Sequence, residues 1–452
     1  MKRIRSTRTT VIPSDKSSKA LIPTQRKLRG GIVALCLITL TACGSVQEPG
    51  ERQAVEGFAG LVAADEPQAA VVGRDVLSDN GSAADAAVAM GFAMGATMPS
   101  RANPGGGGVC VSYLGSERDA VSVTFLPQAS GGATPAPAMS RGLALLHALH
   151  GATNWEELLV PVENLARRGV PVSRAFARDI NEAAEQIPEE SQLGRLLRRE
   201  DGSLLREGDK LVQPGLAGLL GNLRRQGVGY SAGNTLATLL EDAANRAQLD
   251  LSAEAVRSVR PLREVPQEIE VDNDKLFLPA GPFEDRPLRQ RLVRALNEGE
   301  ANATAYRGRD VPSAGLVVAD RFGSAVACEF SMGALFGKQV LLEDSGIIAA
   351  EPVQGEALDS LTTAVIGNQN IPRSRLALAA GGGDSAGAAA HVISGVLERD
   401  EPLDAALSGL PGEARRSLIN AIYCPTGATG SGSGSCRVAR DAHSDGLSFL
   451  VR

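Results

Sequence analysis

The distribution of apolar and polar positions divides the chain into helical and strand-like segments. A helical period in the apolar residues runs through four segments, 141–172, 215–227, 235–248 and 286–297. An Ala-rich stretch with a single acid predicts a buried helix over 83–98, and a further helix is expected over 388–398. Strand-like runs cover 109–114, 316–320 and 325–331, with a turn that joins the last two as a hairpin.

The order of these elements favours a layered α/β sandwich. Helices and strands are mixed in the first part of the chain, and strands become frequent in its C-terminal third. Of the 452 residues 43% are hydrophobic and 22% are charged, which is typical of a globular protein. This length allows about two or three domains or one large interleaved unit, and either can bury a sizeable core.

Charge and motif content exclude several classes of partner and cofactor. The formal net charge is −6, and no basic stripe with interleaved aromatic residues occurs in the body of the chain, so nucleic acid is not an expected partner. The glycines of 105–108 lack the strand–GxGxxG–helix context of a nucleotide site and the lysine of a phosphate loop. No Cys/His spacing suggests a metal site, and His147 and His150 are expected to pack or to lie at the surface. We therefore expect no cofactor and no metal.

The N-terminus is typical of an export signal. Basic residues with a single acid, Asp15, precede an apolar run over 32–40 that is too short to span a bilayer as a helix. The run ends in a sequence that resembles the lipobox of bacterial lipoproteins, Leu40-Thr41-Ala42-Cys43. The resemblance implies cleavage before Cys43 and lipid on its thiol.

These features predict the cellular address of the chain. We expect a lipoprotein signal peptide over 1–42 and a polar tether over 43–68 that leads into the fold. The lipid on Cys43 would anchor the protein in the bacterial cell envelope, facing the periplasm. Because Gly44 follows the cysteine and no Asp does, the outer membrane is favoured over the inner membrane.

Export makes disulfides available. Cys424 and Cys436 flank a Gly/Ser-rich loop, and we expect a bridge between them that closes a hairpin. Cys110 and Cys328 lie in apolar, strand-like runs, where a free cysteine commonly serves as a small buried hydrophobic residue.

Several segments, in this order, resemble the gamma-glutamyltranspeptidase family. The first is the block over 73–89, with Asp85-Ala86-Ala87-Val88-Ala89 at its end and a Gly-rich turn into a strand after it. Segments at 142–172 and 208–233 are similar to the two blocks that follow in the family. The likeness spans nearly the whole mature chain. It implies an α/β (α+β) fold, the four-layer αββα sandwich of N-terminal-nucleophile hydrolases.

The resemblance also implies a precursor that cleaves itself once. In the family, the new N-terminal residue of the small subunit is the nucleophile and its free α-amine, which titrates near ~7.7–8.0, is the general base. The family's nucleophile block aligns with 313–320, which places Ser313 at the nucleophile and the cut at Pro312-Ser313. The chain would then consist of a large-subunit-like part over 69–312 and a small-subunit-like part over 313–452.

Two further parts of the catalytic site follow from the same alignment. Ser331 falls where the family places a hydroxyl that supports the nucleophile. Gly382 and Gly383 lie in a small-residue loop before a helix, where family members supply an oxyanion hole from backbone N–H groups. The implied partner is a small-molecule amide substrate.

The sequence departs from the family in the glutamyl pocket. Leu126 occupies the position of the arginine that binds the substrate α-carboxylate, and a leucine cannot make that bidentate contact. Gly333 replaces an asparagine. Further substitutions in substrate-binding runs lie at 349–352 and 374–377.

Two hypotheses therefore compete. In the first, the chain is an autoprocessed N-terminal-nucleophile amide hydrolase or acyltransferase for a gamma-glutamyl-like or other acyl amide, including glutathione-type substrates. In the second, it keeps the fold, has lost the chemistry and serves as a binding or scaffold lipoprotein. An arginine beside Ser313 would preserve carboxylate recognition, and the candidates are Arg141, Arg373 and Arg375. A wholly apolar pocket would favour a hydrophobic acyl chain.

Overall fold

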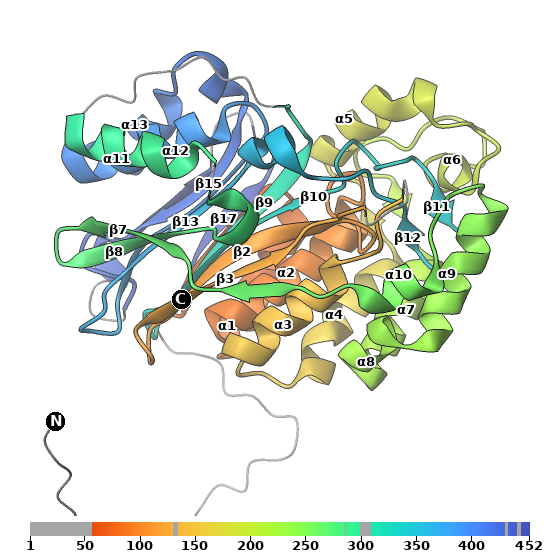
Figure 1. Cartoon of the computed structure of the whole chain (residues 1–452), viewed down its shortest axis with the longest axis horizontal. Helices are drawn as coiled ribbons and strands as arrows, with labels where there is room; N and C mark the ends of the chain where they lie inside the picture. The colour runs from red at the N-terminus through yellow and green to blue at the C-terminus, as the bar shows by residue number, and fades with distance from the viewer. Residues whose placement is uncertain (1–56, 130–133, 285, 299–308, 430–432, 441–443) are drawn as a thin grey trace, which may run out of the picture. The chain divides into compact units, whose positions relative to one another are not determined.

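The computed structural model describes residues 57–452 apart from 130–133, 285, 299–308, 430–432 and 441–443 (Figure 1). The expected signal peptide and Cys43 lie outside these residues, and so does most of the expected tether. Within the described part, none of the helices combines the length and the apolar character that crossing a membrane requires.

Two antiparallel sheets form the centre of the fold. The seven-stranded sheet has the order β17-β1-β9-β10-β2-β3-β6. Its strands are β1 Gly60–Ala64, β2 Gly107–Leu114, β3 Asp119–Phe125, β6 Leu262–Glu264, β9 Ser313–Asp320, β10 Ala325–Ser331 and β17 Leu447–Val451. The six-stranded sheet has the order β16-β15-β14-β13-β8-β7. Its strands are β7 Gln267–Val271, β8 Asp274–Leu278, β13 Leu361–Gly367, β14 Ser374–Gly381, β15 Leu418–Tyr423 and β16 Arg437–Arg440.

Helices cover the outer faces of both sheets (Figure 1). The seven-stranded sheet is covered by α1 Pro67–Ser78, α2 Ala83–Thr97 and α3 Met139–His150, with α4 Trp155–Arg168 packed on α2. More helices follow, α5 Arg174–Ala183, α6 Gln192–Leu196, α7 Pro214–Gln226, α8 Val228–Ala232, α9 Asn234–Arg246 and α10 Ala253–Ser258, with the small strands β4 Val170–Pro171, β5 Lys210–Leu211, β11 Leu341–Leu342 and β12 Ile347–Ile348. The six-stranded sheet is covered by α12 Ser385–Glu398, flanked by α11 Leu288–Glu298 and α13 Leu403–Ser408.

Three apolar clusters fill the spaces between these layers. One lies between the seven-stranded sheet and its helices, and includes Phe92 and Leu316. A second lies between the six-stranded sheet and its helices, and includes Ile393. The third joins the two sheets through residues such as Val317 and Ala379. Helix, sheet, sheet and helix therefore follow one another, so the predicted four-layer αββα sandwich is confirmed.

Helix α2 shows how the sequence builds the innermost layer. Ser82 and Asp85 form a capping box, in which each side chain accepts a hydrogen bond from the other residue's backbone N–H. All the residues of α2 are buried, which small Ala side chains permit. The carboxylate of Asp320, at the end of β9, accepts the N–H of Ala83 at 2.9 Å. The predicted buried helix over 83–98 is thus confirmed, and its first turn is fixed to the sheet.

The expected tether is too long at its C-terminal end. Gly60–Ala64 is the buried strand β1, which pairs with both β9 and β17. The apolar run that forms this strand has only five residues and follows a polar, Gly-bearing segment, so the sequence pattern did not indicate a strand. Because a strand needs only a few residues when it is paired on both sides, tertiary pairing decides the structure here.

The expectation for Cys110 and Cys328 as free buried cysteines is wrong, because the two form a disulfide. They face each other in the register of β2 and β10, which puts their Cα atoms 4.1 Å apart. The two cysteines are 218 residues apart in sequence, so no local pattern predicts that they pair.

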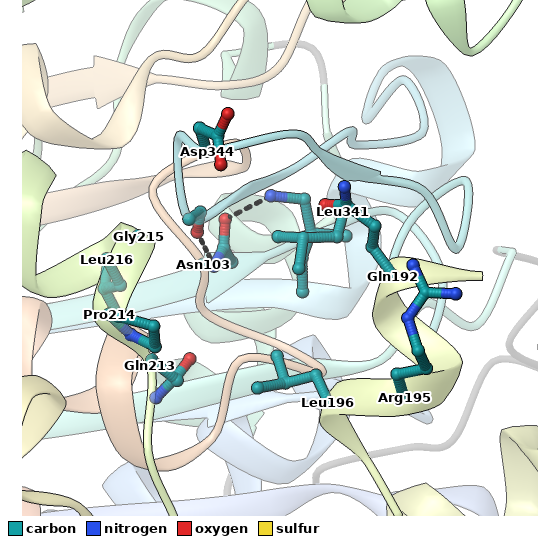
Figure 2. A pocket seen from close by; sticks show the side chains of 12 residues that line it. Asn103, Gln192, Arg195, Leu196, Gln213, Pro214, Gly215, Leu216, Leu341 and Asp344 are labelled. Atoms are coloured by element: carbon teal, nitrogen blue, oxygen red, sulfur yellow. Dashed lines mark hydrogen bonds between the residues drawn. The ribbon is translucent and has the colours of Figure 1, made fainter. Parts of the chain in front are cut away.

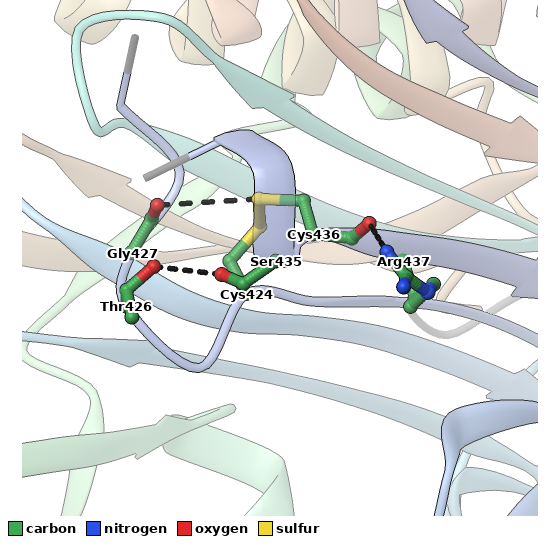
Figure 3. Close-up of a disulfide and its surroundings, with 6 residues drawn as sticks. All are labelled: Cys424, Thr426, Gly427, Ser435, Cys436 and Arg437. Atoms are coloured by element: carbon green, nitrogen blue, oxygen red, sulfur yellow. Dashed lines mark hydrogen bonds between the residues drawn. A yellow bond between two sulfur atoms is a disulfide. The ribbon is translucent and has the colours of Figure 1, made fainter. Parts of the chain in front are cut away.

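Cys424 and Cys436 also form a disulfide, as the flanking loop suggests (Figure 3). They lie at the ends of β15 and β16, whose last register pair is Tyr423 and Arg437. The hydroxyls of Thr426 and Ser435 lie 2.7 Å apart beside the bridge. The disulfide therefore closes a hairpin at the edge of the six-stranded sheet.

Candidate active site

Strands β9 and β10 bring four small or polar residues onto one face of the seven-stranded sheet. Ser313 pairs with Ser331, and Gly315 pairs with Glu329. Side chains alternate along a strand, so these positions share the face of Val317, which packs in the cluster between the sheets. Ser313 and Ser331 are thus neighbours through the pairing of these two strands.

The hydroxyl of Ser331 lies at the peptide bond that precedes Ser313. It donates a hydrogen bond of 2.7 Å to the carbonyl oxygen of Pro312, and it accepts the N–H of Gly333 at 2.9 Å. Ser331 is 1% exposed, so this donor is held in a site from which water is largely excluded. A hydroxyl in this position polarises the Pro312 carbonyl.

The hydroxyl of Ser313 is buried, with the residue 2% exposed, and has no hydrogen-bond partner among the described residues. It lies against Gly381, the last residue of β14 in the other sheet. A Cβ atom added to Gly381 would overlap the Ser313 Oγ and come within 2.6 Å of Glu329 Oε2. A glycine is therefore required at this point, where the two sheets meet around Ser313.

Glu329 is a buried carboxyl beside the same hydroxyl. The residue is 0% exposed, and neither of its side-chain oxygens has a hydrogen-bond partner in the described part of the chain. Burial raises the pKa of Glu329 well above its ordinary value, and the neighbouring Asp65 raises it further. The Ser313 hydroxyl and the Arg101 guanidinium act in the opposite direction.

Two further charged groups frame the strands, the buried Asp65 and the partly buried Arg101. The carboxylate of Asp65 accepts the N–H of Gly315 at 2.7 Å and the side-chain amide of Asn420 at 2.8 Å. Arg101 donates to the carbonyl oxygen of Ser313 at 3.3 Å and binds Asp179 with its other nitrogens, at 2.7 and 2.8 Å. These contacts fix the backbone of β9 at Ser313 and just after it.

Gly382 and Gly383 follow β14 with φ angles of 68° and 48°, which favour glycine. The N–H of Gly382 donates to the carbonyl oxygen of Ser360 at 3.0 Å, so it is already used within the fold. The N–H of Gly383 donates to Asp310 Oδ1 at 2.9 Å. In the uncut chain, the N–H of Gly383 therefore binds the carboxylate of Asp310, which lies three residues before Ser313.

Ser313 opens onto a pocket of about 340 Å³. Its lining includes the charged residues Arg101, Glu182, Asp310 and Arg416, together with Ser313, Gly381 and Gly382. The pocket is not wholly apolar. Leu126 does not line it and packs instead in an apolar cluster with Val311 and Val353.

The three arginines that the sequence suggested do not line this pocket. Arg141 is buried and donates to backbone carbonyl oxygens, among them those of Ser231 and Val256. Arg373 and Arg375 lie at the start of β14, at the other end of the strand from Gly381. Both bind Asp274, the first residue of β8. Each of the three is committed to a structural contact.

A larger pocket of about 620 Å³ lies elsewhere and does not include Ser313 (Figure 2). Asn103, before the glycine turn, lies in its wall, and its Oδ1 accepts the N–H groups of Gly105 and Ile348. Its amide also donates to the Gly346 carbonyl at 3.2 Å. The side chain thus ties the glycine turn to β12, a structural role.

The histidines of α3 have packing partners. His147 contacts Trp155 edge-on and lies 2.9 Å from the Thr153 carbonyl oxygen, and His150 lies 2.7 Å from the hydroxyl of Ser112. Among the described residues, no group of three His, Cys, Asp or Glu side chains is arranged to hold a metal ion.

Sequence reasoning selected Ser313 and Ser331, which the structure pairs across β9 and β10, and did not select Glu329, Asp65 or Arg101. Glu329 had a local signal, because it is the single charged residue in the apolar strand Ala325–Ser331. An ionisable side chain at such a position needs a partner or a function. Asp65 and Arg101 reach the site through contacts between residues distant in sequence, so no local pattern announces them.

Comparison with curated proteins finds relatives over part of the chain. A glutathione hydrolase proenzyme from Bacillus subtilis is 30% identical over 200 residues, which are 39% of this chain and 34% of that protein. A glutathione hydrolase proenzyme from Escherichia coli is 28% identical over 181 residues, 35% of this chain and 31% of the relative. The match therefore spans about a third of the length of these relatives.

Comparison with solved structures agrees on the fold. The crystal structure of a cephalosporin acylase from Bacillus halodurans superposes with a TM-score of 0.67 over 90% of this chain and 98% of that one, at 14% identity. The family model described as gamma-glutamyltranspeptidase matches residues 69–136 and 124–271. Over these residues, which are less than half of the chain, the chain is similar to the gamma-glutamyltranspeptidase family.

Proposed function

We propose that this chain cleaves itself between Pro312 and Ser313 and then acts as an amide hydrolase or acyltransferase of the N-terminal-nucleophile type. The observation that carries the proposal is the 2.7 Å hydrogen bond from the Ser331 hydroxyl to the Pro312 carbonyl oxygen. That carbonyl belongs to the bond that would be cut. A donor aimed at it stabilises the negative charge that develops on the oxygen when the Ser313 hydroxyl attacks.

Cleavage gives Ser313 a free α-amine beside its own hydroxyl. The amine accepts the hydroxyl proton while Oγ attacks the acyl carbon of an amide substrate, and it then returns the proton to the leaving nitrogen. An ester between the acyl group and Oγ remains. Water or an amine acceptor releases the acyl group from this ester and restores the serine.

Gly383 supports the oxyanion role of the loop after β14. Its N–H donates to the Asp310 carboxylate in the uncut chain, so it can reach a negatively charged oxygen in this position. Asp310 lies in the segment that ends at the cut. When that segment moves away, the Gly383 N–H becomes available to a substrate oxyanion, whereas the Gly382 N–H remains bonded to Ser360.

The charged lining of the pocket favours a small amide that carries a carboxylate. Arg101 is committed to Asp179, but the side chain of Arg416 is 67% exposed and lies 3.8 Å from the Asp310 carboxylate. A carboxylate can therefore approach Arg416 within the pocket. Gamma-glutamyl-like amides, including glutathione-type substrates, have this chemistry, and the curated relatives bear the name glutathione hydrolase.

The substrate proposal is tested by replacing Arg416 with alanine in the cleaved protein. Loss of a charge-assisted contact of about 1.5–3 kcal/mol raises the KM for a gamma-glutamyl anilide about 10-fold to 100-fold and changes kcat much less. Arg225→Ala, on the exposed side of α7, is the matched control. An unchanged KM in the Arg416 variant contradicts this assignment of the substrate class.

A second function, a catalytically inactive binding or scaffold lipoprotein, is favoured by one observation. Leu126, at the position of the family's carboxylate-binding arginine, is buried in an apolar cluster with Val311 and Val353. The two functions are separated by the cut itself. A folded chain that stays intact, and that releases no amine from glutathione or a gamma-glutamyl anilide, supports the binding function.

We also propose that the protein is anchored in the bacterial cell envelope by lipid on Cys43 and faces the periplasm, most consistently at the outer membrane. The disulfides Cys110–Cys328 and Cys424–Cys436 support an oxidising compartment. Fractionation of cells that carry Cys43→Ala tests the anchor. The variant leaves the membrane fraction if the anchor is correct, and it stays there if the anchor lies elsewhere.

A further inference from the structure

The self-cleavage proposed above needs a base that the uncut chain does not have at its nucleophile. Before the cut, the nitrogen of Ser313 is part of the peptide bond to Pro312, and an amide nitrogen is not a base at neutral pH. The α-amine that serves later turnovers therefore cannot accept the proton of Ser313 Oγ in this first reaction. Another group in the fold has to accept it.

Three other ionisable groups near Ser313 are already committed. Arg101 is a cation bound to Asp179, and the Asp65 carboxylate accepts the N–H of Gly315. Asp310 accepts the N–H of Gly383. The described histidines contact other parts of the fold, with His391 on α12.

Glu329 has the geometry that the step requires. Its side chain shares the sheet face of Ser313, because the register pairs Ser313 with Ser331 and Gly315 with Glu329. Gly315 leaves space for the carboxyl, since a Cβ there would overlap Glu329 Oε1. Gly381 leaves space for both the Ser313 Oγ and Glu329 Oε2. Two glycines on different sheets thus leave the space that these two side chains occupy.

Both side chains lack another partner. The Ser313 Oγ and the two carboxyl oxygens of Glu329 are buried, and none has a hydrogen-bond partner of ordinary geometry within the described residues. Burying an unpaired carboxyl costs several kcal/mol and is uncommon in protein interiors. The Cys110–Cys328 disulfide, next to Glu329 in β10, holds this strand in register. Keeping a carboxyl beside the nucleophile therefore lowers the stability of the fold.

We propose that Glu329 accepts the proton of the Ser313 hydroxyl during cleavage of the Pro312–Ser313 bond. The proposal rests on the self-cleavage proposed above and assigns a catalytic residue to it.

The step balances in atoms and protons. As the proton moves from Ser313 Oγ to the Glu329 carboxylate, Oγ forms a bond to the carbonyl carbon of Pro312, whose oxygen receives the hydrogen bond from Ser331. The bond from that carbon to the Ser313 nitrogen then breaks, and Glu329 returns the proton to the nitrogen. The resulting ester between Pro312 and Oγ is hydrolysed by water, which leaves a Pro312 carboxylate and a free Ser313 amine.

The groups that face Glu329 predict how cleavage depends on pH. Asp65 from the end of β1 favours the protonated carboxyl, whereas Arg101 and the Ser313 hydroxyl favour the carboxylate. Burial dominates and raises the pKa of Glu329 well above its ordinary value. Only the carboxylate can accept a proton, so the cleavage rate rises with pH until Glu329 is fully ionised and is then constant.

The test follows the cleavage rate of full-length precursor, purified uncut at low pH and shifted to higher pH, by reducing electrophoresis. Glu329→Gln keeps the shape of the side chain and removes the base, so cleavage slows about 10²-fold to 10⁴-fold and loses its rise with pH. Glu66→Gln is the matched control, because Glu66 is also 0% exposed with a raised pKa, but its carboxylate accepts the N–H of Ala69 and caps α1. Glu329→Asp, which retains a shorter carboxyl, cleaves at an intermediate rate and keeps the pH dependence.

The outcomes separate this proposal from the self-cleavage on which it rests. If the wild-type chain and Glu329→Gln are cut between Pro312 and Ser313 at the same rate, Glu329 is not the base and self-cleavage stands. A cleavage rate in Glu329→Gln that is slow but still rises with pH as in the wild type also overturns the role of Glu329. If the folded wild-type chain is never cut, both proposals fail. Cooperative thermal unfolding of each variant shows that a slow rate is not a folding defect.

Discussion

At the scale of single residues, the site depends on polar groups held in a dry interior. Ser313 and Glu329 lie unpaired between the two sheets, and Ser331 is aimed at the carbonyl before Ser313. Water is excluded from these groups, so a hydrogen bond or a charge acts there in a lower dielectric than at the surface. Small changes at these positions are therefore expected to have measurable effects on both stability and cleavage.

Stability should fall with rising pH because of Glu329. Its pKa in the folded chain lies well above the ordinary 4.5, so the unfolded state ionises first as the pH rises. The stabilising contribution is complete below about pH 4.5 and is lost as the pH rises through the folded-state pKa. Urea unfolding at pH 5 and pH 8, in the uncut Ser313→Ala chain, should show a smaller pH difference after Glu329→Gln is added. Equal pH differences with and without that change would contradict the prediction.

Ser331 should matter for the rate of cleavage more than for the fold. Ser331→Ala removes the donor to the Pro312 carbonyl oxygen, and loss of one such donor typically slows a reaction about 10²-fold to 10³-fold. Ser331→Thr keeps a hydroxyl and should retain most of the rate. A time course of cleavage by reducing electrophoresis measures both variants, and wild-type speed in Ser331→Ala would exclude this role.

The residues that the sequence could and could not reveal differ in a physical way. Ser313 and Ser331 were predicted from a family block that lies within one continuous stretch of sequence. The register of β9 and β10 brings the two residues together. Glu329 was visible as an acid in an apolar strand, but its neighbour Gly381 comes from the other sheet. The bond of the Gly382 N–H to Ser360 is also a long-range contact, which an aligned glycine motif cannot show.

At the scale of elements, local patterns predicted several of the longer helices, whereas α1, α5 and most of the strand pairing were not visible. Helix α2 has its cap, its Ala-rich body and its stop within one segment, so its limits were close to those observed. Strand β1 has five residues and exists because β9 and β17 pair with it on both sides. The disulfide between β2 and β10 likewise depends on register, which two separate apolar runs do not specify.

The Cys110–Cys328 disulfide should stabilise the pair of strands that carries Glu329 and Ser331. Removing a native disulfide typically costs about 2–5 kcal/mol, and the Cys110→Ala/Cys328→Ala double variant avoids a leftover thiol. Urea unfolding should show this loss. The Cys424→Ala/Cys436→Ala variant, whose bridge spans only 12 residues at a sheet edge, should lose less. Equal losses in the two variants would contradict this ranking.

At the scale of the whole molecule, one disulfide spans the expected cut and the other does not. Cys110 precedes Pro312 and Cys328 follows it, so cleavage leaves the two parts joined by a covalent bridge. Cys424 and Cys436 both lie after the cut. Strand β9 begins at Ser313 and stays paired with β1 and β10, so the cut requires no rearrangement of the sheet.

The most direct test of self-cleavage at Ser313 is the intact mass of the purified mature protein, with and without reductant, beside Ser313→Ala. The account predicts a single disulfide-linked species without reductant, heavier than the uncut chain by one water. With reductant it predicts two fragments that meet at Pro312-Ser313, and one unbroken chain for the Ser313→Ala control. A folded wild-type chain that remains unbroken after reduction would contradict the account and leave the binding function.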